Sequence, residues 1–114
     1  MKKVQNLVEE ANGLFEQAEV AVESSLENGH DLFLRGITLL FRGFLAANGI
    51  DSNGTISESF AECKQLEEEF EDIEEELDAL INADLSFNDA EDISDSANEI
   101  WDFVIDLVTD DECH

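Results

Sequence analysis

The sequence predicts an all-α protein, specifically an antiparallel up-and-down four-helix bundle. Apolar residues recur at steps of three and four in four separate stretches, and no stretch shows the alternation typical of a strand. The 114 residues include no proline, so nothing interrupts long helices. A chain of this length forms one domain, which we place at residues 1–109, followed by a short frayed acidic tail at 110–114.

The first helix is predicted at about residues 4–27. Its apolar positions share one helical face: Val4, Leu7, Val8, Ala11, Leu14, Phe15, Ala18, Val22 and Leu26. Asn28-Gly29 is expected to end this helix, because both residue types tolerate left-handed backbone. Asp31 is then expected to cap the second helix, predicted at about 31–48.

The second predicted helix is apolar around nearly its whole circumference. Such a helix belongs in the centre of a bundle or at a subunit interface. Gly36 and Gly43 are seven residues apart, and each costs about 1 kcal/mol of helix propensity relative to alanine. Close approach of another backbone would offset that cost. The predicted core and interface residues are therefore Gly36, Leu40, Gly43 and Phe44.

Two further helices are predicted at about 56–81 and 89–108, joined by a connector at 82–88. Thr55 and Glu58 have the spacing of a capping box at the start of the third helix. Heptad-like steps follow along the third helix (Cys63, Leu66, Phe70, Ile73, Leu77, Leu80) and the fourth (Ala90, Ile93, Ala97, Ile100, Val104, Leu107). On this seam Cys63 is expected to be a buried, inert thiol.

The charge is strongly negative and unevenly distributed. The chain has 30 acidic and 5 basic residues, and residues 65–114 carry 20 of the acids and no Lys or Arg. This balance argues against nucleic acid and anionic membranes as partners. It permits divalent cations, a basic protein partner or adaptation to a saline environment. Because no stretch resembles a signal peptide or a membrane span, we expect a cytoplasmic protein.

Residues 51–62 allow two interpretations, a calcium loop or a simple turn. Asp51, Asn53, Thr55 and Glu62 occupy ligand positions of an EF-hand-like loop. However, Ile56 stands where such a loop needs glycine. In the alternative interpretation Gly49 ends the second helix and Thr55 caps the third. The turn interpretation assigns a role to more of these residues than the calcium loop does, and it is the preferred one.

Arg35, Thr38 and Arg42 share one face of the second helix and suggest a pocket for an anion or nucleotide. The alternative is that the arginines neutralise acidic faces of neighbouring helices. The acids between 67 and 78 fall outside the apolar seam and are expected to be solvated. No serine lies near a usable histidine, Cys113-His114 is terminal, and no phosphate-binding loop is present. We therefore expect no enzyme, no catalytic residue and no cofactor.

The helix pattern resembles the HEPN family of small helical bundles. The resemblance rests on LFLRGITLLFRGFLAANGI followed by DSNGT, and on AEDISDSANEIWDFVIDLV with its spacing of Ala90, Ala97, Ile100 and Val104. It implies a bundle that dimerises through its helices and partners a nucleotidyltransferase. Ribonuclease members of the family carry Arg followed four to six residues later by His. No histidine follows Arg35 or Arg42 in that window, so the resemblance implies a non-catalytic member.

The leading functional hypothesis is a non-enzymatic interaction or accessory protein that forms a homodimer. One alternative is an anion- or nucleotide-binding module that uses Arg35 and Arg42. Another is a calcium-responsive protein that uses the loop at 51–62. A further alternative is an acidic decoy of nucleic acid, which binds a basic protein through the two C-terminal helices.

Overall fold

The computed structural model describes residues 2–51, 53–82 and 90–112, and within these ranges it contains helices and turns but no strand. The all-α prediction is confirmed. The helices are α1 (Lys2–Ser24), α2 (Leu26–Ala47), α3 (Ile56–Leu66), the 3₁₀ helix η1 (Glu68–Ile73), α4 (Glu74–Ile81) and α5 (Ala90–Glu112). α5 continues to Glu112, into the segment expected to be a tail. Most of the predicted connector, and residues 113–114 of the predicted tail, lie outside the described residues.

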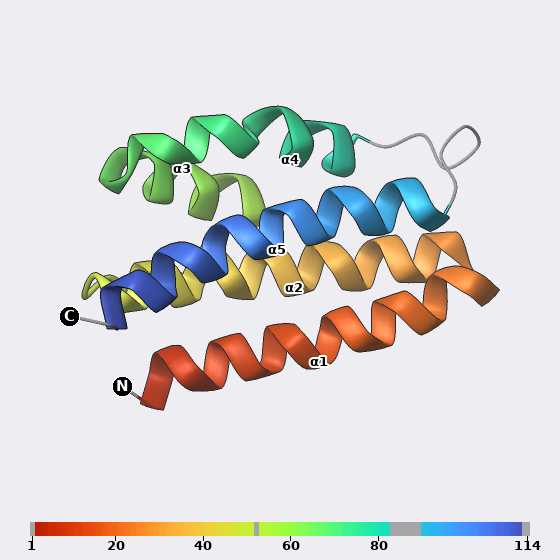
Figure 1. The fold of residues 1–114 in the computed structure, drawn as a ribbon, viewed down its shortest axis with the longest axis horizontal. Coiled ribbons are helices and arrows are strands. Elements are labelled where there is room, and N and C mark those ends of the chain that lie inside the picture. The colour runs from red at the N-terminus through yellow and green to blue at the C-terminus, as the bar shows by residue number, and fades with distance from the viewer. Residues whose placement is uncertain (1, 52, 83–89, 113–114) are drawn as a thin grey trace.

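The helices lie side by side along the long axis of a molecule that measures 42 × 25 × 24 Å. In Figure 1, α1 and the η1–α4 segment run in one direction, and α2, α3 and α5 run in the other, because the chain reverses between α3 and η1. α2 is the central element, because it packs against α1, α3 and α5. α1 packs almost entirely on α2 and meets α5 only over a short stretch.

The apolar circumference of α2 explains its central position. Five of its side chains are fully buried, namely Phe33, Ile37, Leu40, Phe41 and Leu45. Each neighbouring helix contributes one apolar stripe to the same core, such as Phe15 from α1 and Ile100 from α5. Burying one such large side chain contributes roughly 1.5–3 kcal/mol, so α2 supplies a large share of the driving force for folding.

The junction between α1 and α2 differs from the prediction. One residue, Ser25, separates the helices, and its hydroxyl accepts a hydrogen bond from the backbone N–H of Asn28 at 3.4 Å. Gly29 is therefore not a turn residue but a buried residue in the first turns of α2. A Cβ at Gly29 would lie 2.8 Å from the Cα of Val22. The glycine is required by the close approach of α1, a requirement that local sequence patterns do not reveal.

A second glycine, Gly36, also allows α1 to approach α2 closely. A Cβ there would lie 2.6 Å from the ring of Phe15 and 3.3 Å from the carbonyl oxygen of Ala11. At Gly43 the corresponding contacts, to Leu7 and Val8, are both 3.7 Å, an ordinary van der Waals distance. Of the two glycines expected to allow close approach, only Gly36 is therefore sterically demanding.

The prediction of a single helix over 56–81 is wrong, because the helix is interrupted at Glu67. This residue is extended (φ −141°, ψ 108°), and the 3₁₀ helix η1 follows it before α4 begins. Leu66, expected on the apolar seam, is 46% exposed. Lys64 donates a hydrogen bond to the Glu74 carboxylate at 2.5 Å and so connects α3 with α4 across the break.

The break directs Phe70 of η1 into the core. Its ring centroid lies 4.9 Å from that of Phe44, 5.3 Å from Phe103, 6.0 Å from Phe41 and 6.1 Å from Phe60. These partners come from α2, α3 and α5, so one ring contacts three other helices. Aromatic pairs at such separations contribute about 0.5–1.5 kcal/mol beyond the area that they bury.

The turn between α2 and α3 is the one that we preferred from the sequence. Gly49 has φ +80°, and the N–H groups of Gly49 and Ile50 donate to the carbonyls of Ala46 and Leu45, the pattern of a Schellman motif. Thr55 and Glu58 exchange reciprocal hydrogen bonds of 3.2 Å. The predicted capping box is therefore confirmed, and it begins α3 at Ile56.

We predict that Phe70→Ala destabilises the protein by about 3–5 kcal/mol, the usual cost of removing a buried aromatic ring. The matched variant Phe70→Leu keeps an apolar side chain and should retain a larger part of the stability. Urea denaturation followed by circular dichroism measures both. Equal, small losses for the two variants would contradict a central role for this ring.

We also predict opposite effects of alanine at two glycines of α2. Gly36→Ala should lower the free energy of unfolding, because the new methyl group would overlap the Phe15 ring. Gly43→Ala should be neutral or raise it by up to about 1 kcal/mol, since alanine has the higher helix propensity. Thermal melts of both variants measure the difference, and a stabilising Gly36→Ala would refute the close approach at this position.

Candidate functional site

The predicted anion-binding residues lie together on the outer side of α2. Arg35, Thr38 and Arg42 line a hollow of about 360 Å³, together with Leu14 of α1 and Leu39 of α2. Spacings of three and four residues place the three polar side chains on one side of the helix. The structure thus brings the predicted set to one surface hollow, with apolar residues of both helices beside it.

Each of the three polar side chains in this hollow has a partner within the chain. Arg35 Nε lies 2.9 Å from an Asp31 carboxylate oxygen, in a pair whose side chains are 67% and 59% exposed. The Thr38 hydroxyl donates to the Leu34 carbonyl at 2.8 Å. Arg42 Nη2 donates to the Gly54 carbonyl at 3.0 Å and so holds the α2–α3 turn, whereas its buried Nε has no partner among the described residues. The expected pairing with acids of neighbouring helices is therefore not what these contacts show.

A second hollow lies beside the first, mainly on α1. Its volume is about 590 Å³, and its lining is Gly13, Glu16, Gln17, Val20, Ala21 and Leu32. Val20 is 70% exposed, the highest exposure of a large apolar residue in the described part of the chain. A Cβ on Gly13 would meet no atom within 4 Å, so this glycine leaves open space at the surface.

Both hollows belong to one surface, which we call the hairpin face. It is defined by two heptad-spaced rows on the outer sides of the helices: Leu7, Leu14 and Ala21 on α1, and Leu32, Leu39 and Ala46 on α2. All six residues are half-buried. Leu32, Leu39 and Ala46 also pack against the core, and each leaves part of its apolar surface in contact with water.

The predicted core and interface residues of α2 point away from this face. Leu40 is fully buried and Phe44 is 5% exposed, while Gly36 and Gly43 are buried at the contact with α1. These four residues therefore contribute to the internal packing of the chain. Any interface of α2 must instead use its outer residues, such as Leu32 and Leu39.

The predicted calcium ligands are distributed between the α2–α3 turn and α3. Asp51 and Asn53 are exposed in the turn, and Glu62 is exposed in α3. The Thr55 hydroxyl accepts the capping hydrogen bond from the Glu58 amide. Within the described residues, no group of three His, Cys, Asp or Glu side chains is arranged to hold a metal ion. The turn geometry thus uses Thr55 as a helix cap.

Two residues that the sequence did not single out make long-range contacts. His30 Nε2, at the start of α2, lies within hydrogen-bonding distance (2.5 Å) of the Leu80 carbonyl at the end of α4. The ring of Trp101 in α5 lies 4.9 Å from the ring of Phe15 in α1. No local pattern signals the first contact, because the two residues are 50 positions apart. The second was detectable only as an aromatic residue on the flank of a helix.

Cys63 is buried and unsuited to nucleophilic chemistry. Its thiol lies 3.6 Å from the Phe41 carbonyl, to which it donates. Burial, and to a lesser extent the neighbouring Glu62 carboxylate, raises the pKa of the thiol from 9.0 to about 12. The group therefore stays protonated at neutral pH, where only the thiolate would be reactive.

Three comparisons with known proteins complete the description. No family model, no curated protein and no solved structure matches the chain. In the part of the chain that the structure describes, no helix is both long and apolar enough to cross a bilayer. What the protein does must therefore be inferred from its own surface chemistry.

We predict that Cys63 resists thiol reagents in the native protein at neutral pH and reacts at once after unfolding. Cys113→Ser leaves Cys63 as the sole thiol. With a disulfide reagent that releases a coloured thiolate, the absorbance change then measures the reaction of Cys63 alone. Stability should fall as pH rises from about 9 towards 12, because the unfolded thiol ionises before the buried one. Rapid labelling of the folded protein would contradict the burial of Cys63.

Proposed function

We propose that this protein is a non-enzymatic, cytoplasmic interaction protein that forms a homodimer through its hairpin face. The observation that carries the proposal is the double row of half-buried apolar residues on α1 and α2, with the two hollows along it. A second copy that inserts side chains into these hollows would bury apolar surface that the monomer leaves in contact with water.

The charge distribution supports a second copy as the occupant of this face. Two chains of net charge −25 repel each other over most of their surfaces. The hairpin face is different, because Arg35 and Arg42 lie along its α2 side. Exposed acids lie along its α1 side: Glu16 lines a hollow, and Glu10 is one turn from both Leu7 and Leu14.

A two-fold dimer would use both sides of the face at once. In such a dimer the same patch occurs on each subunit, and α2 of one copy lies against α1 of the other. Arg35 and Arg42 would then face Glu10 and Glu16 of the second copy. Complementary charges of this kind determine the register of two subunits more than they determine the affinity.

The arrangement of the helices is part of the same proposal. We infer that α1, α2, the η1–α4 segment and α5 form an antiparallel four-helix bundle of the kind expected from the resemblance to HEPN proteins. The opposite directions of α1 and α2, and of α4 and α5, in Figure 1 support this arrangement. The proposal also includes the dimer and an accessory role beside a nucleotidyltransferase-like partner. The proposal includes no catalytic residue and no cofactor.

An anion-binding function is the second candidate, favoured by the hollow that Arg35, Thr38 and Arg42 line. The unpartnered Nε of Arg42 is the specific observation behind it. Against it, Arg35, Thr38 and Arg42 each make a contact within the chain, and the net charge repels anions. Thermal stabilisation by inorganic phosphate that disappears in Arg35→Gln, but persists in Lys64→Gln, would favour this candidate.

Light scattering after size-exclusion chromatography tests the dimer. The expected mass is twice the 12.7 kDa of the chain, at moderate and at high salt. Leu39→Glu on the hairpin face should give monomers, whereas Leu66→Glu, at an exposed leucine of α3, should leave the dimer intact. Circular dichroism confirms that each variant is folded.

A third variant tests the charge argument without altering the core. Arg35→Glu replaces an exposed base and should weaken the dimer by roughly tenfold, as expected for an interfacial charge pair that becomes repulsive. A monomeric wild-type protein at all concentrations would refute the proposal. So would a folded Leu39→Glu variant that retains the mass of a dimer.

A further inference from the structure

The seam between α1 and α5 is a second surface, where apolar side chains that pack against the core stay partly exposed. The two helices meet where Phe15 and Trp101 touch, with their ring centroids 4.9 Å apart. Trp101 itself is only half-buried, and so are Ile105, one turn further along α5, and Val8 of α1. These three residues form the apolar part of what we call the α1/α5 seam.

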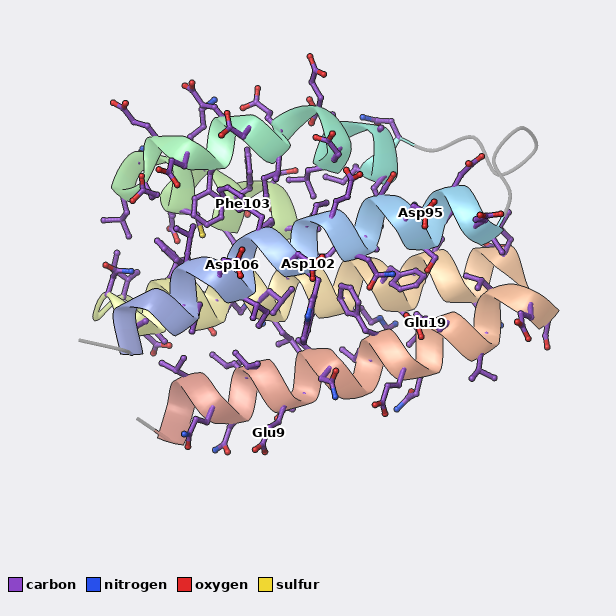
Figure 2. The ribbon with its side chains drawn as sticks, in the orientation of Figure 1. Glu9, Glu19, Asp95, Asp102, Phe103 and Asp106 are labelled. Atoms are coloured by element: carbon purple, nitrogen blue, oxygen red, sulfur yellow. The ribbon has the colours of Figure 1, made fainter. Side chains whose placement is uncertain are left out.

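Carboxylates border this apolar strip on both helices. Asp95, Asp102 and Asp106 lie along α5, and Glu19 lies on α1; all four are exposed (Figure 2). The three aspartates are seven and four residues apart, so they follow one side of the helix over roughly 16 Å. The seam is thus an apolar strip with acidic margins.

No base within these helical stretches compensates the acids. The chain has no Lys or Arg between residues 4 and 34 or between 65 and 114, the stretches that include nearly all of α1 and all of α5. The carboxylates therefore repel one another across the seam, and only salt screens the repulsion. A cationic partner would remove this repulsion on binding, in addition to making its own contacts.

We propose that the α1/α5 seam binds a basic amphipathic helix of another protein. The apolar side of that helix would cover Trp101, Ile105 and Val8, and its Lys or Arg residues would pair with the carboxylates on the margins. The spacing of Asp95, Asp102 and Asp106 corresponds to basic residues that repeat at four and seven over about three turns. The proposal does not depend on the dimer, because the seam and the hairpin face use different sides of α1.

Other occupants fit the seam less well. A second copy of the chain would bring its own negative charge to an acidic margin. A single metal ion would need several ligands around one point, and the described residues include no suitable group of three. The aspartates extend in a row, which matches a row of cations on a helix and not a point charge.

The seam contains its own reporter, because Trp101 is the only tryptophan of the chain. The probe is a synthetic peptide of about four turns without tryptophan, with leucine on one side and lysine at spacings of four and seven. Binding at the seam should cover Trp101, shift its emission to shorter wavelength and reduce its quenching by acrylamide. The titration should saturate at one peptide per chain, and the affinity should decrease as salt increases.

Matched variants separate the seam from the overall charge. Asp102→Asn/Asp106→Asn removes two charges from the seam and should weaken peptide binding by roughly tenfold, because two ion pairs with the peptide are lost. Asp72→Asn/Asp78→Asn removes two exposed aspartates from η1 and α4 and should change binding less than about twofold. Because all four positions are exposed, neither variant is expected to disturb the core.

Several results would overturn the proposal. Equal losses in the two double variants would show attraction by net charge alone. Equal binding of a peptide with the same composition in scrambled order would show that no amphipathic surface is required. The absence of binding at low salt, or binding without any change in Trp101 emission, would exclude the seam as the site. Because dimer mass is measured separately, failure here leaves the hairpin-face proposal intact.

Discussion

The burial of α2 on most of its circumference is the constraint on which the rest of the structure depends. α1 satisfies one side of α2 by approaching it closely at Gly29 and Gly36, positions where a methyl group would overlap Val22 or Phe15. α5 packs on another side, and α3 together with η1 covers the region around Phe41 and Phe44. The side that remains is the hairpin face. The surface that we assign to self-association is thus the part of α2 that the chain itself leaves uncovered.

Much of this fold could be predicted from hydrophobic periodicity and from helix capping. Four helical regions, the Schellman turn at Gly49 and the capping box at Thr55 all depend on residues that are close in sequence. The errors arose where tertiary packing determined the local structure. Asn28-Gly29 has the residue types of a turn, but Gly29 lies in α2 at its contact with α1. The helix is interrupted at Glu67, and Phe70 beyond the interruption packs against four other rings. Neither requirement is visible without the partner residues.

The candidate site was predictable only in part, for a related reason. Helical spacing placed Arg35, Thr38 and Arg42 on one face, and they do line one hollow. The apolar half of that surface was hidden, because Leu14 and Leu39 belong to stripes that also serve the core. The contact of His30 with the Leu80 carbonyl left no sequence signal at all, since a carbonyl is present at every position. Side-chain type predicts a shared face, but it does not predict which backbone groups come near.

The one-residue connection at Ser25 has a consequence for how the protein is made. Contacts between α1 and α2 join residues that are close in sequence, so the loss of chain entropy on forming this hairpin is small. The contacts of α2 with α5 require the whole intervening chain. During synthesis, therefore, we expect the N-terminal hairpin to assemble first and to present the apolar side of α2 that α3 and α5 later cover. This early intermediate is the species most exposed to aggregation, and the acidic C-terminal half completes the fold by covering it.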